Sequence, residues 1–396
     1  MAVVRTSAVR SHIRSKKKVA LVCAGGGVTG AVYQIGYLRA LEELLDRSVL
    51  DFDLFVGVSG GAFVSSLLAN GVSPTELYDA VASRVVRPLG VSAAPLFRLG
   101  LSELLRRSTR APRVLSKALW KAITAEERNV ADLALSLFEL LPAGLLDTSG
   151  LQEFLADLFA RPGRTDSFAR LKRELYIVAV DLDGGDAVAF GEKDAPRVPI
   201  SKAVQASIAL PGLYRPVRIN GRDYVDGGVK KTAHINLAIQ HGADLVIVVN
   251  PLVPLKADHS LRARLGGHLS EKGISYVLDQ VLRIMLHGRM EYGLERYGRE
   301  HPEVDVLVLQ PTRDDVRMFS YNIMRYSARR VVAEHGYRTA VEGFQTRRRE
   351  YAALLSRHGI SLSRAEPPEI PPLLPFHSTL ARTLAGSLNR LESKLK

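Results

Sequence analysis

Cysteine is almost missing from this chain of 396 residues, since Cys23 is the only one. A single thiol excludes an intramolecular disulfide and a cysteine-rich zinc site. The sequence also lacks any run of 18 apolar residues, which argues against a membrane-spanning helix and leaves peripheral contact as the form of any membrane association. We therefore expect a cytoplasmic protein with peripheral membrane contact.

Acidic residues are scarce relative to basic ones. Asp and Glu number 41 against 54 Lys and Arg, which gives a formal net charge of +13. This excess favours anionic partners, although charge alone does not choose among nucleic acid, lipid headgroups and acidic substrates. No acidic residue precedes Glu42. We interpret residues 1–16 as a disordered basic arm, with an organelle transit peptide as the alternative, because the apolar stretch that follows is too short for a secretory signal.

Glycine is concentrated at two points where a predicted strand turns into a predicted helix. The segment "KKVALVCA" is typical of a strand, "GGGVTG" of a turn, and residues 31–45 place apolar side chains at helical spacing. The same order repeats in "FDLFVGV", Ser59 and "GAFVSSLLA". Further strands are predicted over 174–182, 186–192, 243–250 and 304–311. This alternation predicts an α/β fold with a mostly parallel central sheet, helices on both faces, and ligands at the carboxyl ends of the strands.

The domain organisation is predicted as one α/β domain with extensions. The domain covers residues 17–360 and contains a helical insertion at about 96–160, whose basic flank holds Arg98, Arg106, Arg107, Arg110, Arg113, Lys117 and Lys121. Such a flank suits a lid or a membrane-facing surface, and equally a solvated helical face. Residues 361–375 resemble a proline-rich linker, and 376–396 an amphipathic C-terminal helix.

Ser59 stands between glycines at the second of these turns. The letters "GVSGG" fit G-x-S-x-G, the sharp elbow that raises a nucleophilic serine above the edge of an α/β sheet. The next residue, Gly60, begins a helix, so its N–H can face the negative charge that develops on an attacked carbonyl. The alternative is a glycine-rich turn that only allows close packing of helix and strand.

The first turn supplies three consecutive glycines, Gly25, Gly26 and Gly27, whose N–H groups can converge on one anion. We predict that they contribute to an oxyanion hole. The same segment satisfies the G-x-G-x-x-G of dinucleotide-binding folds, but Asp46 lies within a helical run and does not end a second strand. No G-K-[ST] of a phosphate-binding loop is present, so nucleotide binding is the weaker alternative.

Asp226 is the candidate base. It follows a hairpin-like "VRINGRDYV" with Asn220 and Gly221 at its tip, and it precedes two glycines. A well-oriented carboxylate can accept the proton of a serine, whereas the alternative is a surface Asp-Gly turn. His234 is a rival base that would create a Ser-His-Asp arrangement. The other histidines show no metal-ligand spacing, so no metal site is predicted.

Four segments in this order resemble the marks of the patatin-like phospholipase family: "GGGVTGAVYQIGYLRAL", "GVSGGA", "SIALPGLYRPVRINGRDYVDGGV" and "GADLVIVV". The resemblance covers about residues 18–250, and the combination is far more specific than any one motif. It implies a three-layer α/β/α fold and a Ser-Asp dyad, with no catalytic histidine and no metal or organic cofactor. By position, Ser59 corresponds to the nucleophile and Asp226 to the base. Gly25, Gly26 and Gly27 correspond to the oxyanion-hole glycines of the family.

The resemblance also implies a function, that of a serine lipid acyl hydrolase acting on phospholipids, lysophospholipids or acylglycerols through an acyl-enzyme. The expected partners are the lipid substrate and an anionic membrane surface, and no nucleic acid. Two positions depart from the family pattern: Thr29 stands where Arg or Lys is common, and "VKKTAHINLA" stands where asparagine and proline are common. A noncatalytic lipid- or membrane-binding protein on the same fold is the alternative, followed by a nucleotide-binding protein.

Overall fold

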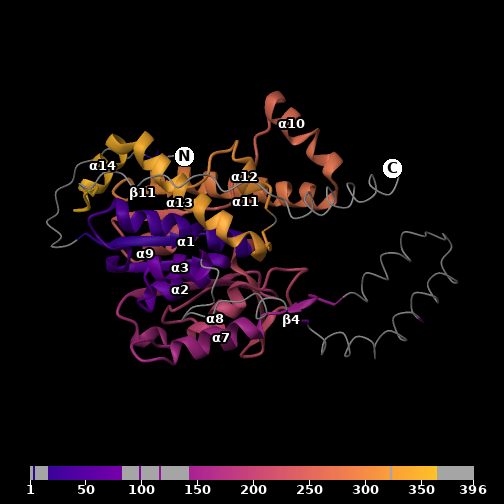
Figure 1. Cartoon of the computed structure of the whole chain (residues 1–396). Helices are drawn as coiled ribbons and strands as arrows, with labels where there is room; N and C mark the ends of the chain where they lie inside the picture. Colours follow the sequence, from indigo (N-terminus) through magenta and orange to yellow (C-terminus); the bar gives the residue numbers. More distant parts are fainter. Residues whose placement is uncertain are drawn as a thin grey trace.

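The computed structural model describes residues 17–82, 142–321 and 323–363, together with 3–4, 98–99 and 116 (Figure 1). Most of the predicted basic arm and much of the helical insertion lie outside the described residues, as do nearly all of the proline-rich linker and the whole C-terminal helix. The predictions for those segments therefore stay predictions.

A nine-stranded mixed sheet forms the centre of the domain. Its central strands are parallel and buried on both faces, as expected when helices cover both sides of a sheet. In spatial order they are β11 (Asp305–Leu309), β10 (Leu245–Val249), β2 (Val19–Cys23), β3 (Leu54–Val58) and β6 (Glu174–Asp181). The strands predicted over 174–182, 243–250 and 304–311 are thus confirmed.

The outer strands of the sheet pair in antiparallel fashion. The outer strands are β1 (Val3–Val4), β7 (Ala187–Phe190), β8 (Val217–Ile219) and β9 (Arg222–Asp226). Asn220 and Gly221 join β8 to β9 with φ angles of 48° and 82°, the left-handed conformations that a two-residue hairpin turn requires. The prediction of a mostly parallel sheet therefore holds for the centre and not for the edges.

Helices cover both faces, and alternate residues of each central strand enter two separate cores. On one face lie α1 (Gly27–Leu44), α2 (Gly60–Ala69), α3 (Pro74–Ala82), α7 (Ser149–Phe159), α8 (Ile200–Ser207), α13 (Arg329–Thr346) and α14 (Arg348–Ser356). On the other lie α9 (Ile235–Gln240) and α11 (Ile274–Glu300). This arrangement is the predicted three-layer α/β/α architecture.

The remaining elements are short. They are α10 (His259–Leu265), α12 (Val316–Phe319), the two-stranded sheet of β4 (Arg98–Leu99) and β5 (Leu146–Asp147), and 3-10 turns at Val49–Asp51, Phe168–Arg170, Gly227–Val229, Leu269–Lys272 and Tyr326–Ala328. In Figure 1, α10 and α11 lie in the upper part of the view, away from α7 and α8 below.

Two strands meet end to end along one edge of β6. Val58, the last residue of β3, is opposite Val178, and Asp226, the last residue of β9, is opposite Ala179, the next residue of β6. Because β7 pairs with the same stretch of β6 from the other side, β3 and β9 must share this edge. The chain therefore leaves β3 at Ser59 directly beside the end of β9, which carries Asp226.

Candidate active site

Ser59 forms a strained turn between β3 and α2. Its φ of 54° lies in the left-handed region, which among the described non-glycine residues only Asn220 shares. Serine adopts this conformation at a cost, so its presence here indicates that the surrounding structure enforces it. The strand, the single turn residue and the helix follow without any further linker, as in a nucleophile elbow.

The glycines after Ser59 are required because backbone lies against them. A Cβ added to Gly60 would lie 2.2 Å from the carbonyl oxygen of Gly27, and one added to Gly61 would lie 2.1 Å from that of Cys23. No side chain fits at such distances, so these residues let α2 begin beside the start of α1. The two helix N-termini, each with unsatisfied N–H groups, thus meet next to Ser59.

Ser207, which sequence reasoning missed, holds the elbow in place. The N–H of Ser59 donates to the Ser207 hydroxyl oxygen at 2.9 Å, and this hydroxyl donates to the carbonyl of Val178 at 2.6 Å. Ser207 is the last residue of α8 and is fully buried. It opens the segment "SIALPG", but nothing in its type or spacing distinguishes it from other serines.

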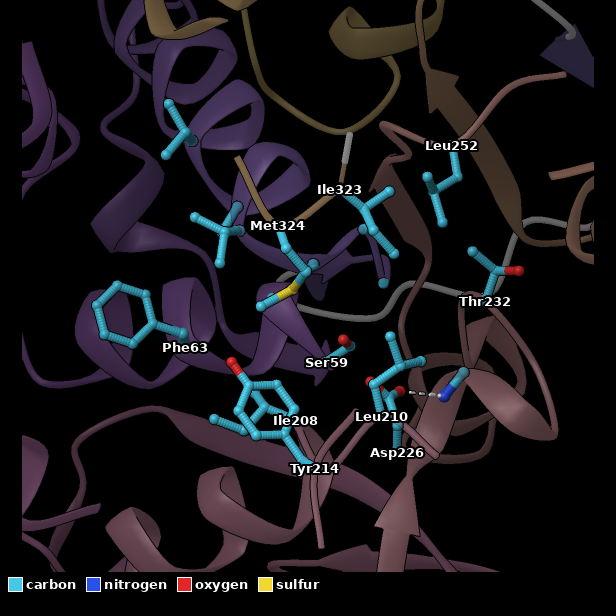
Figure 2. Close-up of a pocket in the computed structure, with 18 of the residues that line it drawn as sticks. Ser59, Phe63, Ile208, Leu210, Tyr214, Asp226, Thr232, Leu252, Ile323 and Met324 are labelled. Carbon is cyan, nitrogen blue, oxygen red and sulfur yellow. Dashed lines mark hydrogen bonds between the residues drawn. The ribbon is translucent and has the colours of Figure 1, made fainter. Parts of the chain in front are cut away.

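Asp226 is buried, with 2% of its surface exposed. Its Oδ1 accepts the N–H of Gly228 at 2.7 Å (Figure 2), and its own N–H donates to the carbonyl of Ala209 at 3.0 Å. Burial raises the pKa of Asp226 to about 6, although interactions with the Ser59 hydroxyl and the Gly228 amide lower it in part. The carboxylate is thus fixed beside the hydroxyl and titrates near neutral pH.

The amides predicted to form the oxyanion hole differ in whether their N–H groups already donate a hydrogen bond. The N–H of Gly25 donates to the carbonyl of Thr232 at 2.9 Å, so it is occupied. Among the described residues, no acceptor engages the N–H of Gly26, Gly27 or Gly60. Gly27 and Gly60 are the first residues of their helices, where the N–H groups face a favourable site for negative charge.

Thr29 occupies the position that departs from the family pattern. Its side chain is 1% exposed, and its hydroxyl has no hydrogen-bond partner among the residues that the structure describes. Its N–H donates to the carbonyl of Ile323 at 3.0 Å. The segment that contains Ile323 therefore supports the glycine turn through the backbone.

An apolar cavity of about 350 Å³ opens onto Ser59 and Asp226. Figure 2 shows Ser59 and Asp226 among the side chains that line it, which include Phe63, Leu210 and Met324. Of the described residues that line it, only Asp226 and Arg289 carry charge. A hydrocarbon chain fits such a lining, because a binding cavity is apolar where its ligand is apolar.

His234 lies apart from this cavity. It precedes α9, is 3% exposed, and is not among the described lining residues. Burial lowers its pKa to about 4, with a further contribution from the charge of Lys231, whereas a hydrogen bond with the Gly227 backbone opposes the decrease. The imidazole is therefore neutral at pH 7 and is oriented by the turn that follows Asp226.

Neither a metal-binding cluster nor a membrane-spanning helix occurs in the described part of the chain. No group of three or more His, Cys, Asp or Glu in that part of the chain could hold a metal ion. No described helix combines the length and the apolar character needed to cross a membrane.

Comparisons with known proteins identify the family of this chain. The model of a family described as patatin-like phospholipase matches residues 21–239, which is more than half of the chain. The "Probable lipid hydrolase 463L" of Invertebrate iridescent virus 6 is 21% identical over 231 residues, covering 58% of this chain and 66% of that protein. The chain thus spans slightly less than two thirds of this relative.

Two solved structures align over much of the chain at low similarity. VipD from Legionella pneumophila aligns with a TM-score of 0.36 and 15% identity, over 88% of this chain and 68% of that one. ExoU of Pseudomonas aeruginosa, in complex with SpcU, aligns with a TM-score of 0.27 and 17% identity, over 71% and 53%. Because both TM-scores are below 0.5, the family assignment rests on the family model.

Proposed function

Because the chain belongs to the patatin-like phospholipase family, we propose that it is a serine lipid acyl hydrolase with Ser59 as nucleophile and Asp226 as base. The observation that carries this proposal is the junction on β6, which puts the ends of β3 and β9 side by side. The strained elbow, the buried carboxylate and the apolar cavity support it independently.

The proposed first half-reaction acylates the serine. The ionised Asp226 takes the proton of the Ser59 hydroxyl while the oxygen attacks the ester carbonyl. The N–H groups of Gly26, Gly27 and Gly60 donate to the oxyanion, at the N-terminal ends of α1 and α2. The tetrahedral intermediate then breaks its bond to the alcohol part of the lipid, which leaves with the proton held by Asp226.

The second half-reaction returns the enzyme to its starting state. Asp226 takes a proton from a water molecule, whose oxygen attacks the acyl-enzyme carbonyl and forms a second oxyanion at the same amides. Collapse of this intermediate releases the fatty acid, and Ser59 recovers its proton. The same carboxylate thus acts twice, and no metal or organic cofactor is needed.

The substrate class follows from the cavity. Its apolar lining suits the acyl chain of a phospholipid, lysophospholipid or acylglycerol. We propose that the protein meets its substrate as a peripheral protein on an anionic, cytoplasmic membrane surface, because the chain carries a net charge of +13.

Replacement of the nucleophile tests the proposal. We expect Ser59→Ala to lower hydrolysis of a p-nitrophenyl ester by at least about 10³-fold and to abolish labelling by a fluorophosphonate probe. The matched control is Ser66→Ala in α2, the helix that follows Ser59, where the hydroxyl donates to the Phe63 carbonyl. Wild-type fatty acid release by folded Ser59→Ala protein would refute the assignment.

A second substitution separates dyad from triad. His234→Ala should leave kcat/KM within about threefold of wild type, because the imidazole does not contact the cavity. Some stability is lost, since the change leaves a buried space. An activity loss as large as that of Ser59→Ala, in protein with a native circular dichroism spectrum, would make His234 the base.

A further inference from the structure

One face of α11 exposes bulky apolar side chains to solvent. Their exposed fractions are 72% for Ile274, 60% for Leu278, 45% for Val281, 53% for Ile284 and 52% for Met285. We call these five residues the α11 strip. The other exposed positions between 274 and 288 are a serine and a glycine, so this stretch exposes no charged side chain, and the first exposed charge after it is Arg289.

The spacing makes the strip continuous. Successive members are three or four residues apart, with Ile284 and Met285 adjacent, so they share one side of the helix. From Ile274 to Met285 the strip is about 17 Å long, at a rise of about 1.5 Å per residue. Single exposed apolar residues are ordinary on protein surfaces, whereas a contiguous patch that excludes charge marks a contact surface.

The strip leads to the mouth of the catalytic cavity. Met285 belongs to the strip and also lines the cavity, as does Leu282 of the same helix. Val229, which is 45% exposed and follows Asp226 by three residues, lines the cavity too, and its carbonyl accepts a hydrogen bond from Arg289 of α11 at 2.8 Å. Apolar surface therefore extends from α11 into the site without interruption by an acidic residue other than Asp226.

We propose that the α11 strip is a membrane-docking surface, whose side chains insert into the interfacial layer of a lipid bilayer and place the mouth of the cavity against it. This inference rests on the proposed lipid substrate and adds the surface that reaches it. An acyl chain would then pass from bilayer to cavity along apolar side chains. A second protein copy on the strip would instead cover Met285 and close this route.

The strip can be tested without touching the catalytic machinery. Ile274→Glu and Leu278→Glu change exposed residues that do not line the cavity, so folding should be unaffected. The matched control is Leu182→Glu, which is 51% exposed, directly follows β6, and belongs neither to the strip nor to the cavity lining. All three are introduced into full-length protein carrying Ser59→Ala for binding, and into wild type for activity.

We expect each strip variant to bind phosphatidylcholine–phosphatidylglycerol vesicles roughly tenfold or more weakly in sedimentation, because a charge replaces an inserted apolar group. Hydrolysis of vesicle phospholipid should fall in parallel, while hydrolysis of a water-soluble p-nitrophenyl ester stays unchanged. Leu182→Glu should match its parent in all three assays.

A fluorescent label reports insertion directly. Cys23 is fully buried, so Leu278→Cys can be labelled selectively with an environment-sensitive fluorophore. Vesicles should shift its emission to shorter wavelength, and the same label on Leu182→Cys should not respond.

Several results would overturn the proposal. Vesicle binding that is absent in Ser59→Ala protein, or that Leu278→Glu leaves intact, excludes the strip as the docking surface. A wild-type dimer by light scattering that Leu278→Glu dissociates, with no label response to vesicles, assigns the strip to a second copy. If wild type hydrolyses no ester, the proposed function fails, whereas the binding and label assays still decide the role of the strip.

Discussion

At the residue scale, the burial of Asp226 raises the pKa of its carboxyl group. A carboxyl group that titrates at about 6 is closer to neutral pH than an ordinary aspartate. A base with a higher pKa accepts a proton more readily, provided that it remains ionised at the working pH. The hydrogen bond from Gly228 and the proximity of Ser59 prevent a larger rise.

The rate should follow this titration. We expect kcat/KM for a soluble ester to rise with pH through a midpoint of about 6, because only ionised Asp226 can take the serine proton. A stopped-flow or plate assay between pH 4.5 and pH 8 measures the profile, in a substrate without ionisable groups. A flat profile across that range would contradict the assignment of Asp226 as the base.

The contribution of Asp226 to the free energy of unfolding should fall as pH rises, whereas the rate of hydrolysis rises. The folded-state pKa of Asp226 lies above its unfolded value, so its contribution to stability is fully present below pH 4 and is lost as pH rises through about 6. Asp226→Asn removes the buried charge, and at pH 8 we expect it to raise the free energy of unfolding by about 3 kcal/mol, the equivalent of the pKa shift.

Urea titrations of wild type and Asp226→Asn check this expectation at two pH values. At pH 4 the two proteins should differ little, since the wild-type carboxyl is protonated there. An inactive variant with no gain in stability at pH 8 would indicate that Asp226 is better solvated than its burial suggests.

At the element scale, the site depends on how closely α1 and α2 begin. Gly60→Ala places a methyl group against the Gly27 carbonyl, so α2 must move and the amides beside Ser59 must separate. We expect a loss of roughly 10²-fold in turnover, comparable with the removal of one oxyanion donor, and a lower melting temperature.

The matched control is another glycine in a helix. Gly288 lies in α11 with nothing within 4 Å of an added Cβ, so Gly288→Ala should preserve activity and slightly increase stability. Equal activity of the two variants would show that the close approach of α1 and α2 does not position the donors.

At the scale of the whole molecule, the net charge of +13 should act over longer range than the α11 strip. We expect the affinity for anionic vesicles to fall as salt rises from 50 to 500 mM, because electrostatic attraction is screened. The binding that remains at high salt should depend on Leu278, since apolar insertion is not screened. Vesicle affinity that is independent of both salt and anionic lipid would contradict an electrostatic contribution to binding.

The sequence is informative where the physics is local. Strand-turn-helix order, the Asn220-Gly221 hairpin and the glycine requirement around Ser59 depend on neighbours in the chain, and the structure agrees with each. The roles of Ser59 and Asp226 were predicted from motifs and resemblance, and these roles stay predictions until the variants are measured.

Other features depend on distant partners and could not be predicted. The shared edge of β6 arises from strand order, which no local pattern encodes. The engagement of Gly25 by Thr232 and the support of Ser59 by Ser207 join segments far apart in sequence. On α11, the sequence shows apolar residues around the helix, but only the packed structure distinguishes the exposed Leu278 from the buried Leu286.

The meeting of β3 and β9 on β6 also bears on protein synthesis. During translation, Ser59 leaves the ribosome well before Asp226 does. Strand β6, which aligns the two residues, emerges between them. A nascent or truncated chain that ends before the β8–β9 hairpin therefore carries the nucleophile without its base. Under the proposed mechanism, such fragments cannot attack the membranes of the cell that makes them, and translation itself delays the onset of hydrolysis.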